Sequence, residues 1–169
     1  ASSSAPAHAG ADALLARLFP RQFDNRYDGW RTALWVLGLL LFMRLAMSVN
    51  SIFNTEQVAA GADKFPLASY GANGARAVLM LFALHAIAEL MLALVGVLAL
   101  VRYRTMVPFV FLLLGAEHVA RRFIVQGYAI EGSAPTPAAY VINYGMLALL
   151  VIGLALSLIP ARKRRSTEV

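Results

Sequence analysis

The sequence predicts an all-α protein: a four-transmembrane-helix bundle with both termini in the cytoplasm and a short N-terminal interfacial helix. Composition is the first reason. Of the 169 residues 60% are hydrophobic and 14% are charged, and the mean hydropathy is +0.66, whereas a soluble domain is nearer half apolar and about a quarter charged. The second reason is a set of four apolar runs, at residues 32–49, 77–101, 105–125 and 138–160. Each run is close to the ~20 residues that a helix needs to cross hydrocarbon, where a helix satisfies its own backbone hydrogen bonds.

The basic residues are the third reason, because they set the orientation of the bundle. Ten of them flank one side of the four runs: Arg17, Arg21, Arg26, Arg31, Arg102, Arg104, Arg162, Lys163, Arg164 and Arg165. The positive-inside rule places this side, and with it both termini, in the cytoplasm. The net charge of +6 is therefore interpreted as a topology signal, and no nucleic-acid partner is expected. With an Ala-, Leu- and Arg-rich composition, the pattern predicts a multi-pass protein of a bacterial cytoplasmic (inner) membrane.

The chain divides into three parts. Residues 1–29 form a cytoplasmic tail with an amphipathic interfacial helix, residues 30–160 form the bundle, and residues 161–169 form a basic cytoplasmic tail of the kind that binds anionic lipid. The connection at residues 50–74 is the longest, and a short helix is expected near Thr55–Ala60. The interfacial helix is predicted from four apolar residues that share one helical face: Leu14, Leu15, Leu18 and Phe19.

Polar residues inside the predicted spans all fall in the outer half of the bundle. The tight turn centred on Tyr103 lets their depth be counted. Glu89 lies 14 residues before it and Glu117 14 residues after it, so both are ~21 Å above the inner surface at ~1.5 Å per residue. His85 and Arg121, 18 residues away on either side, are ~27 Å above it. The full set of candidate site residues is Arg44, His85, Glu89, Glu117, His118, Arg121, Arg122, Tyr140, Asn143 and Tyr144.

The cost of burying charge predicts that these side chains face inward. A charge in hydrocarbon costs at least ~2.5–3.5 kcal/mol, so such residues pair with one another or line a wet cavity. Glu89 and Glu117 lie at one height and cannot comfortably both ionise without a cation. Arg44, ~18 Å above the inner surface, is nearest in height and is the expected partner. Arg121 and Arg122 are long enough to snorkel outward.

Three interpretations of this polar cluster stay open. It is an ion-paired core that fixes helix register without any ligand, or an outward-facing pocket for a lipophilic ligand with a polar head, such as a quinone or a lipid. The third interpretation is a haem b between His85 and His118, the two histidines of the predicted spans. A di-metal carboxylate site does not fit, because the Glu-x-x-His pattern that such sites use on two helices is absent. No other metal site is predicted.

One stretch resembles a known family. "AIAELMLALVGVLALVRYRTMVPFVFLLL" contains Ala88, Glu89 and Leu90, then Gly96 and the short basic turn Arg102–Thr105. On these residues, and on the order of four helices with a long outer loop, residues 32–125 resemble the DoxX-like group of small four-helix bacterial membrane proteins. The Gly-x-x-Lys-Leu ending of that group's first helix is absent, and "MSVNSIFN" stands in its place. The resemblance implies a quinone-linked or accessory role, and only Glu89 carries over by position.

The function expected from these features is that of a small, non-catalytic integral membrane protein. It would be an accessory or redox-associated subunit whose outer polar pocket binds a quinone or a lipid, with the lipid bilayer and other membrane protein subunits as partners. One alternative is a proton-coupled small-molecule transporter in which Glu89, Glu117 and His85 form the relay. Another is a purely structural subunit of a respiratory or photosynthetic complex. The chain has no cysteine, which excludes disulfides, thiolate metal sites and cysteine nucleophiles.

Overall fold

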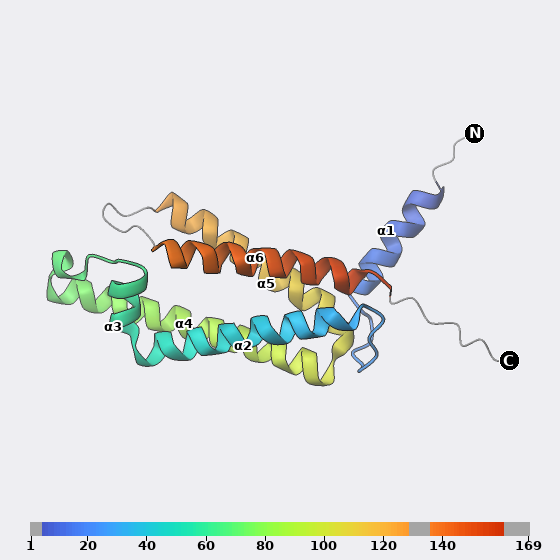
Figure 1. Ribbon diagram of the computed structural model, residues 1–169, viewed down its shortest axis with the longest axis horizontal. Coiled ribbons are helices and arrows are strands. Elements are labelled where there is room, and N and C mark those ends of the chain that lie inside the picture. The colour runs from blue at the N-terminus through green and yellow to red at the C-terminus, as the bar shows by residue number, and fades with distance from the viewer. Residues whose placement is uncertain (1–4, 129–135, 161–169) are drawn as a thin grey trace.

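The structure, a computed structural model that describes residues 5–128 and 136–160, is built from long helices (Figure 1). No β-strand occurs within these two ranges, where Gly29 and Pro160 form an isolated antiparallel bridge. The predicted all-α class is therefore confirmed. The five longest helices are α1 (Ala5–Leu18), α2 (Arg31–Phe53), α4 (Gly71–Arg102), α5 (Val107–Gly127) and α6 (Pro137–Leu158).

Among the described residues, three helical segments are long and apolar enough to cross a membrane. They are α2, α6 and the segment Leu67–Arg102, which contains α4 and the turn before it. The remaining long helix, α5, has 21 residues but carries Glu117, Arg121 and Arg122 in its second half. Length and composition thus support three spans directly, and α5 differs from them by its charges.

Local sequence explains where the helices start and why two of them are longer than their apolar runs. Thr136 Oγ1 accepts a hydrogen bond from Ala139 N at 3.3 Å, which satisfies one of the free amides at the start of α6. Pro137 follows at the first helical position, where its missing amide costs nothing. Around the connection between them, α2 continues to Phe53 and α4 begins at Gly71. The apolar pattern ends where hydrocarbon would end, whereas backbone hydrogen bonding continues through the polar residues beyond it.

The connection between α2 and α4 is folded. The short helix expected near Thr55–Ala60 is present as α3 (Thr55–Gln57), followed by a π turn at Val58–Ala62. Ala59 is fully buried, and the rings of Phe65 and Phe82 meet edge-on with centroids 6.1 Å apart. The connection therefore packs back onto the outer part of α4 (Figure 1).

Two glycines set which helices pack closely. α2 packs along α4 and α6, and α5 packs along α6, while the consecutive helices α4 and α5 contact each other little. A Cβ at Gly96 would overlap the side chain of Leu41, and a Cβ at Gly153 would overlap the ring of Phe111. Small residues that let backbones approach are typical of helix contacts in membranes. The pairs α2–α4 and α5–α6 are held together in this way.

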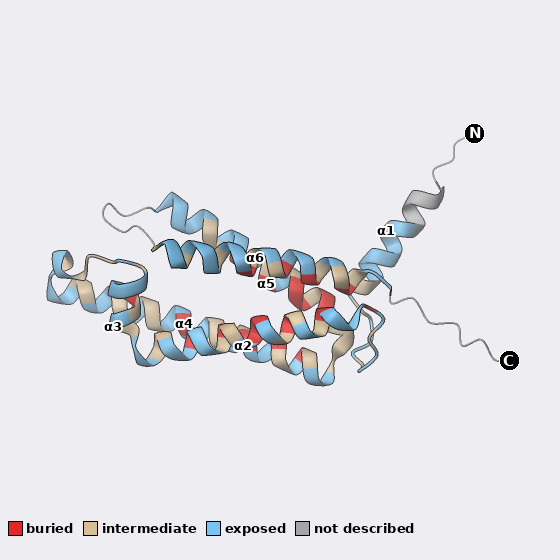
Figure 2. Ribbon diagram, viewed as in Figure 1, coloured by how far each residue is buried: buried red, intermediate tan, exposed pale blue. Residues whose placement is uncertain are grey.

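The apolar core occupies the half of the bundle nearer to α1 (Figure 2). Buried residues are concentrated between the middle of the helices and the end at which α1 joins them (Figure 2). This distribution agrees with the sequence pattern, in which the polar residues lie further out. The core cluster consists of Ala33, Leu37, Leu40, Leu41, Ala93, Ala99, Val107, Val110, Phe111, Leu114, Met146 and Leu150.

The helix α1 extends away from the end of the bundle at which α6 ends (Figure 1). Arg17 Nη1 donates a hydrogen bond to Leu158 O at 2.5 Å, and the Phe19 ring packs on Phe109 at 5.8 Å between centroids. Leu14 and Leu15 are about half exposed, which leaves an apolar edge free. The interfacial placement of this helix stays a prediction, and the basic tail at 161–169 lies outside the described residues.

Candidate functional site

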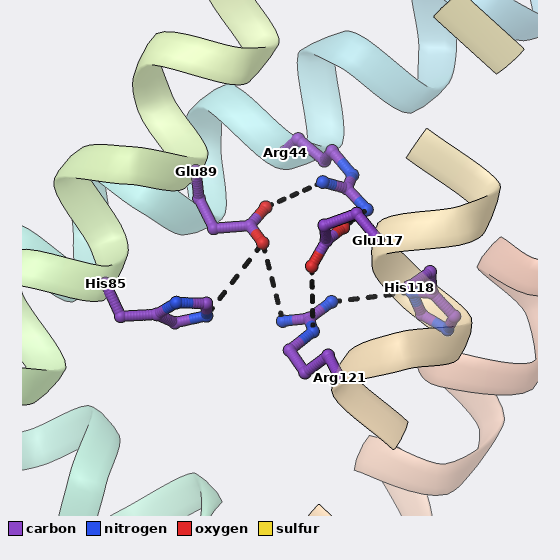
Figure 3. A network of polar contacts seen from close by, with 6 residues as sticks. All are labelled: Arg44, His85, Glu89, Glu117, His118 and Arg121. Atoms are coloured by element: carbon purple, nitrogen blue, oxygen red, sulfur yellow. Dashed lines mark hydrogen bonds and ion pairs between the residues drawn. The ribbon is translucent and has the colours of Figure 1, made fainter. Parts of the chain in front are cut away.

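Two arginines and two glutamates from three helices form a closed ring of ion pairs, the charged ring (Figure 3). Its members are Arg44 on α2, Glu89 on α4, and Glu117 and Arg121 on α5. Arg44 Nη1 donates to Glu89 Oε2 at 2.7 Å, and Arg44 Nη2 donates to Glu117 Oε2 at 2.6 Å. Arg121 closes the ring, with its Nε 3.3 Å from Glu117 Oε1 and its Nη1 3.9 Å from Glu89 Oε1.

The charged ring is balanced in charge, and Arg44 at its centre is buried. The side chain of Arg44 is 3% exposed and that of Glu89 is 12% exposed, so water solvates neither well. Buried charges are tolerated when they are paired and hydrogen-bonded, and here two positive groups face two negative ones. Arg44 is the cation that two carboxylates at one height require. The predicted pairing of Arg44 with Glu89 is confirmed, and Glu117 shares the same guanidinium.

Arg121 does not extend outward toward the surface, the orientation that its length allows, and instead contacts the two glutamates. Its side chain is 35% exposed and turns inward to both glutamates (Figure 3). The position explains this, because Arg121 is one helical turn beyond Glu117 on the same face of α5. An inward arginine gains two carboxylate partners that would otherwise share the single cation of Arg44.

The two histidines flank the charged ring on opposite sides (Figure 3). His85 Nε2 lies 3.9 Å from Glu89 Oε1, and its side chain is half exposed. His118 is buried at 4% exposure, and its Nδ1 is 3.4 Å from Arg121 Nη2. The contacts between the imidazoles thus run through Glu89 and Arg121. A haem between two histidines needs an apolar slot, and here a charged pair occupies that region, so the geometry does not favour the haem interpretation.

A cavity of ≈ 260 Å³ lies beside the charged ring, between α5 and α6. We name it the outer cavity. Its lining is mixed: polar groups come from both helices, and apolar side chains complete the wall. The lining residues are His118, Val119, Arg122, Phe123, Gln126, Asn143, Tyr144 and Leu147. His118 lines this cavity and contacts Arg121, so it connects the two parts of the site.

Arg122 is fixed at the cavity by two tyrosines of α6. Its Nη2 donates to Tyr144 Oη at 2.9 Å, and its guanidinium lies 4.9 Å from the centre of the Tyr144 ring and 5.5 Å from that of Tyr140. The two rings are stacked, with centroids 6.5 Å apart. Asn143 donates to Ala139 O at 2.8 Å. These contacts hold a cation and hydrogen-bonding groups in the lining of the outer cavity, next to its apolar side chains.

The ten candidate residues therefore divide into two groups that meet at His118. The charged ring and its histidines account for six of them, and the outer cavity is lined or flanked by Arg122, Asn143, Tyr144 and Tyr140. Sequence reasoning missed Val119, Phe123, Gln126 and Leu147. Their signal was present, since Val119, Phe123 and Gln126 share a face of α5 with Arg122 at helical spacing. Within the described ranges, no group of three or more His, Asp or Glu side chains is arranged to hold a metal ion.

Asp63, in the folded connection after α3, is a further residue that the sequence did not single out. Burial raises the pKa of its carboxyl above the ordinary value, and the charge of Arg121 acts in the opposite direction. The connection thus brings an acidic group within electrostatic range of the charged ring. A loop residue without periodic neighbours carries no sequence signal for such a position.

No protein-family model matches the chain, and neither a curated protein nor a solved structure is similar to it. The DoxX-like resemblance of residues 32–125 therefore stays a prediction from those residues.

Proposed function

We propose that the chain crosses a bacterial inner membrane four times, with α5 as the additional span and both termini in the cytoplasm. The charged ring supports α5 as a span, because Glu117 and Arg121 are each paired with an oppositely charged side chain, which lowers the cost of placing them in a membrane. The arginines at the inner end support the orientation.

Cysteine labelling tests this topology, since the chain has no native cysteine. Glu56→Cys, in the outer connection, should react with a membrane-impermeant maleimide in intact spheroplasts, and Thr167→Cys only after permeabilisation. Labelling of both in intact spheroplasts would contradict the proposal.

We further propose that the protein is an accessory or redox-associated membrane subunit whose outer cavity holds the polar head of a lipophilic ligand, a quinone or a lipid. The main support for this proposal is the mixed polar and apolar lining of the outer cavity. Hydrogen-bonding groups and one cation, from His118, Arg122, Asn143 and Tyr144, face an apolar wall that includes Phe123. Small-molecule sites are generally apolar with a few placed polar groups. A quinone ring or a lipid headgroup matches that combination.

The volume of the outer cavity limits how the ligand sits. Pockets for whole ligands typically measure ~300–1,000 Å³, and this one has ≈ 260 Å³. It accommodates a head group or a single ring, so an isoprenoid or acyl tail would lie along the helices in the bilayer. Phe123 is 69% exposed beside the cavity and would face that tail. The resemblance to DoxX-like proteins is a further reason to consider a quinone.

Mass spectrometry of ligands extracted from the purified protein tests this function. Leu147→Trp fills the outer cavity, whereas Val151→Trp places the same side chain one turn further along α6, at a site that is 60% exposed and outside the lining. A quinone or a particular lipid should be enriched over bulk lipid in the parent and in Val151→Trp, and lost in Leu147→Trp. Equal extracts from all three proteins would contradict the proposal.

The closed charged ring favours one second candidate, a purely structural subunit of a larger complex. Its members satisfy one another without a ligand, and buried polar groups of this kind specify helix register in some proteins. A stable, stoichiometric partner in mild detergent, together with unchanged extracts from Leu147→Trp, would support it. The transporter alternative gains no such support, because both glutamates are already paired with arginines. Substrate uptake into proteoliposomes that is abolished by Glu89→Gln would revive it.

A further inference from the structure

A second cavity lies at the end of the bundle where α1 joins it, away from the charged ring, and we name it the inner cavity. It has ≈ 120 Å³ and is bordered by α1, the segment before α2 and the inner ends of α5 and α6. Since one water accounts for ~30 Å³ of liquid, this space corresponds to roughly four waters, about the size of a phosphate group. In Figure 1 this is the end at which α1 joins the bundle and the chain leaves α6.

Three arginines line the inner cavity: Arg17, Arg26 and Arg104. Two of them are fixed by the backbone, since Arg17 Nη1 donates to Leu158 O at 2.5 Å and Arg104 Nε donates to Leu100 O at 3.2 Å. A guanidinium has five N–H donors in a rigid fork that matches phosphate oxygens. Arg17 and Arg104 are therefore held in place, and each keeps further N–H donors that a ligand can use.

Acidic groups near the inner cavity do not cancel this charge. Asp28 is the acidic member of the lining, against three arginines. Arg26 Nε lies 3.7 Å from Asp24 Oδ2 in an exposed pair, and exposed pairs of this kind are weak. The lining keeps a positive balance, which is suited to an anion.

Tyr27 provides an independent sign of a ligand. Its hydroxyl is buried and has no hydrogen-bond partner among the described residues, and the ring borders the inner cavity. Close packing on Gly29 fixes it, because a Cβ there would lie 2.6 Å from the hydroxyl oxygen. Burial raises the pKa of Tyr27 to about 12, so the phenol keeps its proton at physiological pH. Buried polar atoms almost always have partners, and an acceptor in the cavity would supply one.

We propose that the inner cavity binds a phosphate group, carried either by an anionic lipid headgroup or by a soluble phosphate compound. Thr105 lines the same cavity and adds a second hydroxyl to the arginine donors. In the proposed orientation the cavity faces the cytoplasmic leaflet, where anionic lipids are concentrated. This site is separate from the outer cavity and does not depend on what the outer cavity binds.

Binding to the full-length chain in detergent tests the proposal with two probes, phosphatidylglycerol (with phosphatidylcholine as the zwitterionic reference) and inorganic phosphate. Lipid binding is read by native mass spectrometry, and phosphate binding by phosphorus NMR. Tyr27→Phe removes only the hydroxyl, and Arg26→Gln removes an exposed charge without disturbing the core. Arg102→Gln is the matched control, because Arg102 is exposed at the same end but does not line the cavity.

The parent should prefer phosphatidylglycerol to phosphatidylcholine, bind inorganic phosphate, or do both. Tyr27→Phe should lower the affinity for the probe that binds about tenfold, which is the effect of losing one hydrogen bond to a charged group. Arg102→Gln should leave that affinity unchanged. A response confined to phosphatidylglycerol assigns the lipid as the source, a response confined to inorganic phosphate assigns a soluble compound, and a response to both shows that the cavity binds the phosphate group common to the two. If Tyr27→Phe and Arg26→Gln both bind each probe as the parent does, the arginines serve only to orient the chain in the membrane and the proposal fails.

Discussion

Replacing Arg44 should destabilise the bundle more than any other single change in the charged ring. Arg44→Met keeps much of the side-chain volume but removes the cation that binds Glu89 at 2.7 Å and Glu117 at 2.6 Å. Breaking a buried ion pair from one side costs ~3–5 kcal/mol, because the remaining charge is left uncompensated. Arg121 stays near both carboxylates and offsets part of this cost. The expected loss is therefore about 3 kcal/mol, a large share of the ~5–15 kcal/mol that stabilises a typical protein.

Reversible unfolding of the protein in mixed micelles, followed by circular dichroism, measures this loss. Arg31→Met is the matched control, since Arg31 begins the same helix and is exposed, and its free energy of unfolding should change by less than about 0.5 kcal/mol. Adding Glu117→Gln to Arg44→Met removes one stranded carboxylate and should recover about 1 kcal/mol or more. If Arg44→Met unfolds like the parent, or the second substitution lowers stability further, the charged ring is not the source of stability inferred here.

Two further predictions concern packing and the inner end of the bundle. Gly153→Ala should lower the free energy of unfolding by about 1–3 kcal/mol, because the new Cβ overlaps the Phe111 ring. Gly115→Ala is the control, since Gly115 has open space around it, and this substitution should be neutral or stabilising. Equal effects of the two substitutions would contradict the packing of Gly153 on Phe111. The raised pKa of Tyr27, about 12 against an ordinary 10.0, means that folding favours the neutral phenol, so its contribution to stability is complete below pH 10 and is lost as the pH rises toward 12. Tyrosinate absorbance should show one late-titrating group that Tyr27→Phe lacks, so the two proteins should titrate alike below pH 11 and differ above it; a parent that already forms one tyrosinate more than Tyr27→Phe below pH 11 would contradict this.

Much of the charged ring is predictable from sequence because helices convert residue number into height. The tight turn at Tyr103 makes Glu89 and Glu117 equidistant from one surface, and the cost of burying charge then requires a cation between them. Arg44 was the basic residue nearest in height. Physical constraints of this kind, rather than any motif, led to the pair that the structure contains.

Other parts of the site depend on lateral arrangement, which residue counting does not provide. The height of a residue does not show that α4 packs on α2 while α5 packs on α6. The outer cavity is lined by residues of α5 and α6, so its position depends on that second pairing. Gly96 and Gly153 determine the close contacts, but a glycine in an apolar run carries no sign of its partner. The inward orientation of Arg121 depends likewise on how Glu89 of α4 approaches α5.

Solid-state NMR of the protein in lipid bilayers tests the charged ring most directly. With ¹⁵N-labelled arginine and ¹³C-labelled glutamate, dipolar recoupling reports guanidinium nitrogens in contact with carboxylate carbons. The geometry predicts strong contacts from two glutamates to the Arg44 guanidinium, which disappear in Arg44→Met while a weaker set from Arg121 persists. Spectra of the parent without contacts between arginine and glutamate side chains would contradict the closed ring and, with it, the four-span arrangement proposed for the chain.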